Sequence, residues 1–427
     1  MATPGAQPDA SAPPGGSVPT PLWAVLTLTF LGSLGTGAVT NGFSFIASEG
    51  LGYGRGMNLL MALVLGGSYI GGALASGPIV GTLSRRSTAL TPRWLLGVVL
   101  VVIGCVCFLP TLAEWFAPGL LEPALWVLIL VFSPMTGILW PIVESYISGG
   151  RRERALRSAV GRFNIVWAGA LVVAFWGMAP LLKEHPFVIL VLLGVAHFLM
   201  CGLLVWFPKY PARHVDFEHE PVPAVYARLL ILFRVLLIAS YIVLSTLSPL
   251  LPIVEDKLGV AVQWKTPIAS AWLTSRVLVF LLLERWHGWH GRWSMPWIGL
   301  ALMLLGFAGC MVSPMFGGLG TAVLILGLAV TGCGIAITYY GALYYAMAVG
   351  NAEVDAGGKH EAMIGMGYTL GPMCGLASVG LGGGSDDAFR FWVIVLVSVG
   401  VLGSTLVGWR LLRRSRDRES PVAPSPH

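Results

Sequence analysis

Residues 94–112 read Trp-Leu-Leu-Gly-Val-Val-Leu-Val-Val-Ile-Gly-Cys-Val-Cys-Phe-Leu-Pro-Thr-Leu, a stretch without a charged side chain. Its length falls within the range of about 17–25 apolar residues that a transmembrane helix needs. The whole chain has the same character: of 427 residues, 56% are hydrophobic and 11% are charged, and the mean hydropathy is +0.79. Because a soluble domain carries about 25% charged residues, this composition excludes a water-soluble globular enzyme. The sequence therefore predicts a polytopic membrane protein.

Similar hydrophobic segments follow one another at short intervals along the chain. The 55 glycines fit such a protein, because small residues let transmembrane helices pack closely. We expect an all-α membrane protein with twelve spans, at residues 22–46, 57–83, 94–112, 124–148, 159–182, 187–207, 229–254, 267–283, 295–315, 319–349, 362–381 and 391–412.

The longest polar connection, residues 208–228, divides these spans into six and six. It predicts an N-terminal half over residues 22–207, a cytoplasmic linker, and a C-terminal half over residues 229–412. Residues 1–21 are rich in Pro, Ala, Gly and Ser and contain no Lys or Arg. They therefore lack the basic region of a signal peptide, and we expect a disordered cytoplasmic tail there and a basic one at residues 413–427.

The distribution of basic residues predicts the orientation. With the N-terminus inside, 20 Lys and Arg residues fall in the inner loops and tail and 5 fall in the outer loops. Cytoplasmic loops carry the excess of positive charge in membrane proteins. We therefore expect a multi-pass protein of the cell (inner or plasma) membrane with both termini in the cytoplasm. The same bias accounts for the net charge of +6, so no nucleic-acid partner is implied.

The two halves show a weak internal repeat at an offset of about 200 residues. Residues 140–145 of the fourth span fall on residues 340–345 of the tenth, and each is followed by a polar loop and a span that opens with polar residues. This order of features is typical of transporters built from two related halves.

Six plus six spans, a polar central loop, both ends inside and a repeat between halves resemble the major facilitator superfamily. In the loop after the second span, Gly81 and Leu83 match the superfamily pattern G-x-L-a-D-r-x-G-r-k, but Arg85 stands where the pattern has Asp. The resemblance implies two pseudo-symmetric six-helix halves, with spans one, four, seven and ten around a central cavity. It also implies a cytoplasmic loop gate, whose acidic member has moved to the second half or been lost; the gate candidates are Arg85, Arg86, Glu284 and Arg285.

Arg276 lies near the middle of the eighth span. An Arg at mid-bilayer costs roughly 2.5–3.5 kcal/mol even on the lenient insertion scale. We therefore expect its side chain to face a wet cavity or a buried carboxylate. It is a candidate anchor for an anionic solute or a coupling residue, and a purely structural ion pair is the alternative.

Glu144 lies toward the cytoplasmic end of the fourth span. It shares one helical face with Trp140 and with Ser133, Gly137 and Ser148, because the steps between them are three or four residues. Such a stripe suits a solute path on which the carboxylate carries a proton or pairs with a cation. The alternative is that Glu144 pairs with loop arginines at the interface.

Further polar residues inside spans are candidate substrate contacts. Amides within helices often bond only to neighbouring backbone, so structural roles remain open for them. The tyrosines lie on spans that the resemblance places around the cavity. The set comprises Asn41, Asn164, Tyr241, Tyr340 and Tyr344.

Two stripes of small residues repeat every four positions and predict close helix packing or hinges. The second contains Pro372 and is similar to the G-x-x-x-G-P-x-x-G motif that drug-exporting members of the superfamily carry on span five, although here it lies in span eleven. The stripes are Ser68, Gly72 and Ser76, and Gly367, Gly371 and Gly375.

Enzyme-like patterns are incomplete. His360-Glu361 begins like H-E-x-x-H, but Ile364 stands in place of the second zinc ligand. We expect this pair at a cytoplasmic helix start, where Glu favours the helix dipole. The six cysteines form no CxxC pair, and no nucleotide-binding loop is present. We therefore expect no metal site, no cofactor, and no obligate protein partner.

These features predict a secondary transporter that moves a small organic solute across the bilayer by alternating access. Energy would come from a gradient, with H+ as the candidate coupling ion and Glu144 as the titrating group. Two alternatives remain: an uncoupled facilitator, and a non-transporting membrane enzyme or partner protein that keeps the fold.

Overall fold

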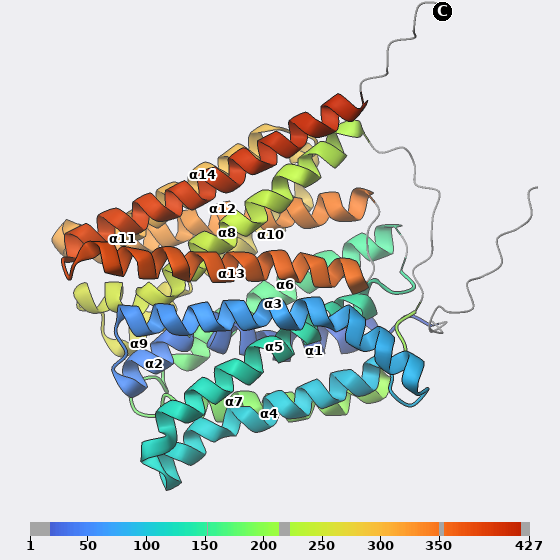
Figure 1. Ribbon diagram of the computed structural model, residues 1–427, viewed down its shortest axis with the longest axis horizontal. Helices are drawn as coiled ribbons and strands as arrows, with labels where there is room; N and C mark the ends of the chain where they lie inside the picture. The colour runs from blue at the N-terminus through green and yellow to red at the C-terminus, as the bar shows by residue number, and fades with distance from the viewer. Residues whose placement is uncertain (1–17, 152, 213–222, 350–353, 420–427) are drawn as a thin grey trace, which may run out of the picture.

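The first half of the chain forms a bundle of long helices. The computed structural model describes residues 18–151, 153–212, 223–349 and 354–419, and every element within them is a helix (Figure 1). The elements are α1 (Leu22–Gly35), the π-helical turn η1 (Thr36–Asn41), α2 (Phe43–Leu51), α3 (Arg55–Arg86), α4 (Pro92–Phe116), the short 3-10 turn η2 (Pro118–Leu120), α5 (Leu121–Ser148), α6 (Glu153–Met178), α7 (Val188–Leu203) and η3 (Leu204–Trp206).

The second half follows the same plan. Its elements are α8 (Ala224–Lys257), α9 (Val262–Ala269), α10 (Ala271–Arg285), η4 (His287–Trp289), α11 (Ser294–Val312), η5 (Ser313–Leu319), α12 (Gly320–Val349), α13 (Val354–Gly382) and α14 (Asp386–Glu419).

Twelve spans result, as the hydrophobic segments predict. Eleven stretches of the described residues are long and apolar enough to cross a membrane, and one of them, Ser294–Ala346, has 53 residues. At 1.5 Å per residue that stretch is far too long for one crossing. It contains α11 and α12, which pack along each other, and the chain reverses at Gly317, whose φ of 52° is left-handed. Splitting it raises the count from eleven to twelve.

Three helix boundaries differ from the sequence-based ranges. Helix α8 begins at Ala224, inside the expected linker, because Pro223 suits the residue just before a helix. Helix α14 continues to Glu419, past residue 412, because basic side chains favour a helix C-terminus. Helix α13 begins at Val354, two turns before His360 and Glu361. The expected tails at residues 1–17 and 420–427 lie outside the described residues.

The two halves meet along the middle of the molecule, where α13 lies beside α3 (Figure 1). The contact is close enough that a Cβ on Gly66 would lie 2.4 Å from the carbonyl oxygen of Tyr368. A second contact joins α6 to the α9–α10 segment, where the Trp176 indole donates a 3.1 Å hydrogen bond to the Ser270 hydroxyl. The space between these two contacts holds the site described below.

The small-residue stripes lie in tight helix contacts. A Cβ on Gly371 would lie 2.1 Å from the Ser245 hydroxyl oxygen, and one on Gly375 would lie 2.4 Å from the Leu59 side chain. Ser76 is buried and donates to the Ala73 carbonyl oxygen. The glycines therefore allow close approach of helices, as predicted, and their use as hinges stays a prediction.

Gly72 and its neighbour Gly71 offer a matched test of this packing. A Cβ on Gly72 would lie 2.0 Å from the Pro134 carbonyl oxygen, whereas one on Gly71 would meet nothing within 4 Å. Gly72→Ala is expected to lower the free energy of unfolding by about 1–3 kcal/mol or more, as overpacking does. Gly71→Ala is expected to leave it unchanged or raise it by up to about 1 kcal/mol through helix propensity. Thermal unfolding in detergent measures both, and equal melting temperatures would contradict the packing.

Candidate functional site

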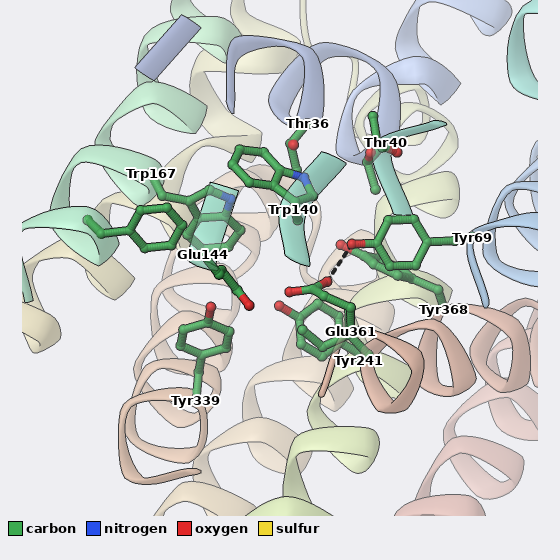
Figure 2. A pocket seen from close by; sticks show the side chains of 13 residues that line it. Thr36, Thr40, Tyr69, Trp140, Glu144, Trp167, Tyr241, Tyr339, Glu361 and Tyr368 are labelled. Carbon is green, nitrogen blue, oxygen red and sulfur yellow. Dashed lines mark hydrogen bonds between the residues drawn. The ribbon is translucent and has the colours of Figure 1, made fainter. Parts of the chain in front are cut away.

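A pocket lies between the two halves, near the middle of the spans. The space that the centre of a water molecule can occupy there is about 30 Å³, which is room for about two waters. Side chains therefore nearly fill the pocket in this conformation. The first half contributes Thr36, Thr40, Tyr69, Thr136, Trp140, Glu144, Phe163 and Trp167, and the second half contributes Tyr241, Tyr339, Glu361, Ile364 and Tyr368 (Figure 2).

The first span is irregular where it borders this pocket. The π-helical turn η1 separates α1 from α2, and within it Asn41 donates a 3.0 Å side-chain hydrogen bond to the Thr36 carbonyl oxygen. Single π-helical turns within α-helices are frequent at functional sites. This turn carries Thr36 and Thr40 to the pocket wall. Asn41 itself lines a separate small pocket. The hydrogen bond to Thr36 uses its amide donor for a structural purpose.

Two carboxyl groups from different halves converge in the pocket. Glu144 of α5 and Glu361 of α13 lie within hydrogen-bonding reach of each other, and Figure 2 shows their carboxyl oxygens facing into one space. The Tyr69 hydroxyl of α3 donates a hydrogen bond to Glu361. Glu361 is only 6% exposed. A carboxyl group from each half therefore faces the same pocket.

The placement of Glu361 corrects the interpretation of His360-Glu361 as an interfacial helix start. Because α13 starts at Val354, the pair lies well inside the helix, and Glu361 faces the pocket. Of the loop arginines that are the alternative partners of Glu144, Arg151 donates to the carbonyl oxygens of Tyr146 and Ile147, so that alternative stays a prediction. Trp140 and Glu144 of the α5 stripe line the pocket, while Ser133 and Gly137 of the stripe pack against α3; their role on a solute path stays a prediction.

Arg276 is fully buried beside the pocket. Its guanidinium carbon lies 4.4 Å from the ring centre of Trp167, 4.6 Å from that of Tyr339 and 5.4 Å from that of Phe280. The Tyr241 hydroxyl is close enough to interact with it. No guanidinium nitrogen, however, makes a hydrogen bond of good geometry to any of the residues that the structure describes. Arg276 therefore forms no ion pair with a carboxylate of the described residues.

Aromatic rings form most of the wall around Arg276. Trp167 and Tyr339 face each other across the two halves with ring centres 5.7 Å apart and planes 5° apart. Tyr241 and Tyr368 meet edge to face at 5.0 Å. Cations are attracted to such ring faces, by about 2 kcal/mol or more where water is excluded. Ring faces thus stand where the sequence suggested a carboxylate partner. Tyr241 lines the pocket, and its role as a substrate contact stays a prediction.

A wider chamber lies next to the pocket along α6 and α12, since Phe163 and Tyr339 line the pocket and Asn164 and Tyr340 line the chamber. Water centres can occupy about 500 Å³ of it. Three candidate residues, Asn164, Tyr340 and Tyr344, lie here rather than in the central pocket. Asn164 is buried, and its side-chain oxygen has no hydrogen-bond partner among the described residues. The histidines of the η4 loop, His287 and His290, also line the chamber, with His290 stacked on Tyr344 at 4.3 Å.

Of the four expected gate residues, Glu284 lines the chamber, and Arg85, Arg86 and Arg285 are not among its lining residues. Glu284 lines the chamber and approaches α6, where a Cβ on Gly161 would lie 3.3 Å from its carboxylate. Arg85, Arg86 and Arg285 are exposed at helix ends. Within the described ranges, no ion pair joins any of these four residues, so the gate stays a prediction.

One membrane face is closed by polar contacts between the halves. Buried Lys265 of α9 pairs with Glu49 of α2 and, at 2.5 Å, with Asp256 of its own half. Arg55 of α3 pairs with Asp386 of α14 at 2.7 Å. Deeper, the Ser44 hydroxyl donates to the Ser248 carbonyl oxygen at 3.0 Å. The contacts between the halves join residues more than 200 positions apart in the chain, so no local pattern in the sequence indicates them.

The fold of this chain is similar to that of solved membrane transporters. No protein-family model and no curated protein matches the sequence. Among solved structures, the chain is similar to the nucleoside transporter NupG, with 16% identity, a TM-score of 0.65, and 92% of this chain and 99% of that chain covered. It is also similar to a bacterial homologue of the human lysosomal transporter Spinster in an inward-facing, occupied conformation (16%, 0.62, 95% and 100%). A third is a variant of the E. coli fucose:proton symporter FucP (14%, 0.55, 91% and 98%).

Proposed function

We propose that this chain, whose fold is that of the major facilitator superfamily, is a secondary transporter that moves a small organic solute by alternating access. The observation that carries the proposal is the asymmetry of the space between the halves. Ion pairs join the halves at one end, and a chamber of about 500 Å³ lies between α6, α10 and α12 next to the central pocket. A site that is open to one side and latched on the other is what rocking halves alternate between.

We further propose that transport is coupled to protons through the pair of Glu144 and Glu361. The two carboxyl groups belong to different halves and can share one proton, so that loss of the proton leaves two like charges facing each other. The repulsion then favours separation of the halves. A membrane potential supplies about 2.3 kcal/mol per charge at 100 mV. The other titratable or charged groups near the pair are Tyr69, Tyr241, Tyr339, Tyr368, Arg276 and His360.

Uptake into proteoliposomes tests both proposals. Uridine, L-fucose and benzoate are supplied as radiolabelled solutes, with and without an imposed pH gradient, and internal pH is followed with a trapped dye. Accumulation of one solute above the external concentration, only with the gradient, supports coupled transport. Equilibration that ignores the gradient indicates the uncoupled facilitator. Absence of flux for every solute favours a non-transporting protein.

The orientation is a further prediction. Reporter fusions at residues 85–93, 151–157, 209–220 and 413–427 are expected to read cytoplasmic, and fusions at 183–186 and 386–390 external, because the basic residues are concentrated in the first set. An external reading at 209–220 would contradict the division into six and six spans.

The ion pairs of Lys265 with Glu49 and Asp256, which we call the latch, can be tested by substitution of Lys265. Lys265→Ala leaves Glu49 and Asp256 facing each other without a cation, so the halves are expected to separate more often on this side. Ser248→Cys, just beneath the latch, then reacts several-fold faster with an impermeant maleimide added from that face. Arg390→Ala is the matched control, because Arg390 pairs with Asp387 within α14 and with no residue of the first half among those described. Equal labelling of both variants would contradict the latch.

A further inference from the structure

We infer that the central pocket takes a flat, ring-bearing monoanion, such as an aromatic carboxylate, with its anionic group on Arg276 and its ring against the aromatic wall. The inference rests on the proposed function, since it names the solute class for the same pocket. Beside that pocket, the hydrogen-bond donors of Arg276 lack acceptors among the described residues.

The unsatisfied groups are donors. Arg276 has five N–H groups and no acceptor site of its own, and Nε and both terminal nitrogens lack hydrogen-bond partners among the described residues. The carboxyl pair differs, because Glu361 receives the Tyr69 hydroxyl and Glu144 interacts with Glu361. Leaving a buried donor without a hydrogen bond costs about 1–3 kcal/mol, and more if the donor is charged. What the pocket lacks is therefore an acceptor, and a negatively charged one best matches a guanidinium.

The position of Arg276 determines how a ligand reaches it. The residue is 0% exposed and is covered by the rings of Trp167 and Tyr339. Both rings line the pocket, and they belong to opposite halves. Movement of one half relative to the other therefore separates the two rings and exposes the guanidinium to the pocket. A single guanidinium compensates one negative charge, and the neighbouring carboxyl groups disfavour a second.

The wall favours a ring in the rest of the ligand. Trp140, Tyr241 and Tyr368 line the pocket together with Trp167 and Tyr339. Aromatic pairs contribute about 0.5–1.5 kcal/mol beyond the area that they bury. A cationic ligand is disfavoured, because the ring faces of Trp167 and Tyr339 already bear the charge of Arg276.

Binding to the purified full-length protein in detergent tests the inference without requiring transport. The probes are benzoate, its neutral isostere benzamide, the cation benzylammonium, the saturated cyclohexanecarboxylate, and acetate. Quenching of tryptophan fluorescence and the shift in melting temperature report binding, since Trp140 and Trp167 line the pocket. Benzoate is expected to bind at least about tenfold more tightly than the other four, the factor that about 1.4 kcal/mol supplies.

Variants locate the binding. Arg276→Gln is expected to weaken benzoate at least about tenfold, and Arg276→Lys to give an intermediate loss, because Lys keeps the charge but not the planar fork. Arg413→Gln is the matched control: Arg413 also lies over a tryptophan ring, Trp409, but is exposed at the end of α14. Melting curves without ligand confirm that each variant is folded.

Three results would overturn the inference: no benzoate binding, equal binding of benzamide or benzylammonium, or unchanged benzoate affinity in Arg276→Gln and Arg276→Lys. The proposed function fails separately. Flux of uridine or L-fucose without benzoate binding would support the proposed transporter and contradict the anion site. Benzoate binding that depends on Arg276, with no flux of any solute, would support the anion site and contradict the proposed transporter.

Discussion

Glu144→Gln in proteoliposomes is expected to abolish accumulation of solute driven by a pH gradient. Gln keeps the shape of the side chain and its hydrogen bonding to Glu361, but it cannot release a proton. Glu361 then faces a neutral amide in either protonation state, so loss of its proton no longer produces the like-charge repulsion that separates the halves. Exchange of labelled for unlabelled solute across the membrane is expected to persist, because it needs no net proton movement. Accumulation and exchange are measured on the same vesicles.

Two further variants make this test specific. Glu361→Gln is expected to give the same loss, since either carboxyl group is half of the pair. Glu184→Gln carries the same change in the exposed loop between α6 and α7 and is expected to transport normally. If Glu144→Gln still concentrates solute against its gradient, Glu144 is not the proton carrier. If only Glu361→Gln fails, the proton resides on Glu361 alone.

Arg276→Met is expected to separate stability from function. The substitution removes a buried cation whose nitrogens have no hydrogen-bond partner among the described residues and leaves an apolar chain of comparable length. Replacing buried charge by apolar groups is often neutral or stabilising by about 1–4 kcal/mol, and the loss of the ring contacts offsets part of that gain. The ligand-free variant is therefore expected to melt at or above the temperature of the parent protein, while solute binding and transport are lost.

Arg55→Met is the control with a charge partner. Arg55 pairs with Asp386 at 2.7 Å and lies 4.7 Å from the ring centre of Phe389, so its removal is expected to lower stability by up to about 1 kcal/mol, the usual limit for an exposed pair. Differential scanning fluorimetry in one detergent compares the two variants. A marked loss of stability in Arg276→Met, with solute binding intact, would show that Arg276 holds the structure together rather than the solute.

The candidate site could be predicted from the sequence only in part. Helical spacing predicts that Glu144 and Trp140 share one face of α5, because that spacing depends on local geometry alone, and both side chains line the pocket. Arg276 was identified by the cost of a charge in mid-span, but its surroundings were not. Stacked rings from two halves surround it, and no pattern within the eighth span indicates which rings will arrive.

Glu361 shows why the rest was missed. Its neighbourhood in the sequence is typical of a helix start, and an apolar run begins just after it, so the helix boundary was placed too late. The helix in fact starts at Val354 and carries Glu361 inward until it meets Glu144. The π-helical turn in the first span and the Lys265 latch have the same character, since each depends on contacts that form only in the folded molecule.

The sequence by itself determined that this chain crosses the membrane twelve times with all-helical spans. Each segment partitions into the bilayer according to its own length and hydrophobicity, and in lipid a spanning segment must satisfy its backbone hydrogen bonds internally. The tertiary structure alone decided which polar side chains meet. Glu144, Glu361, Arg276 and Lys265 find their partners across helices and across halves, because those distances are set by how the helices pack rather than by spacing along the chain.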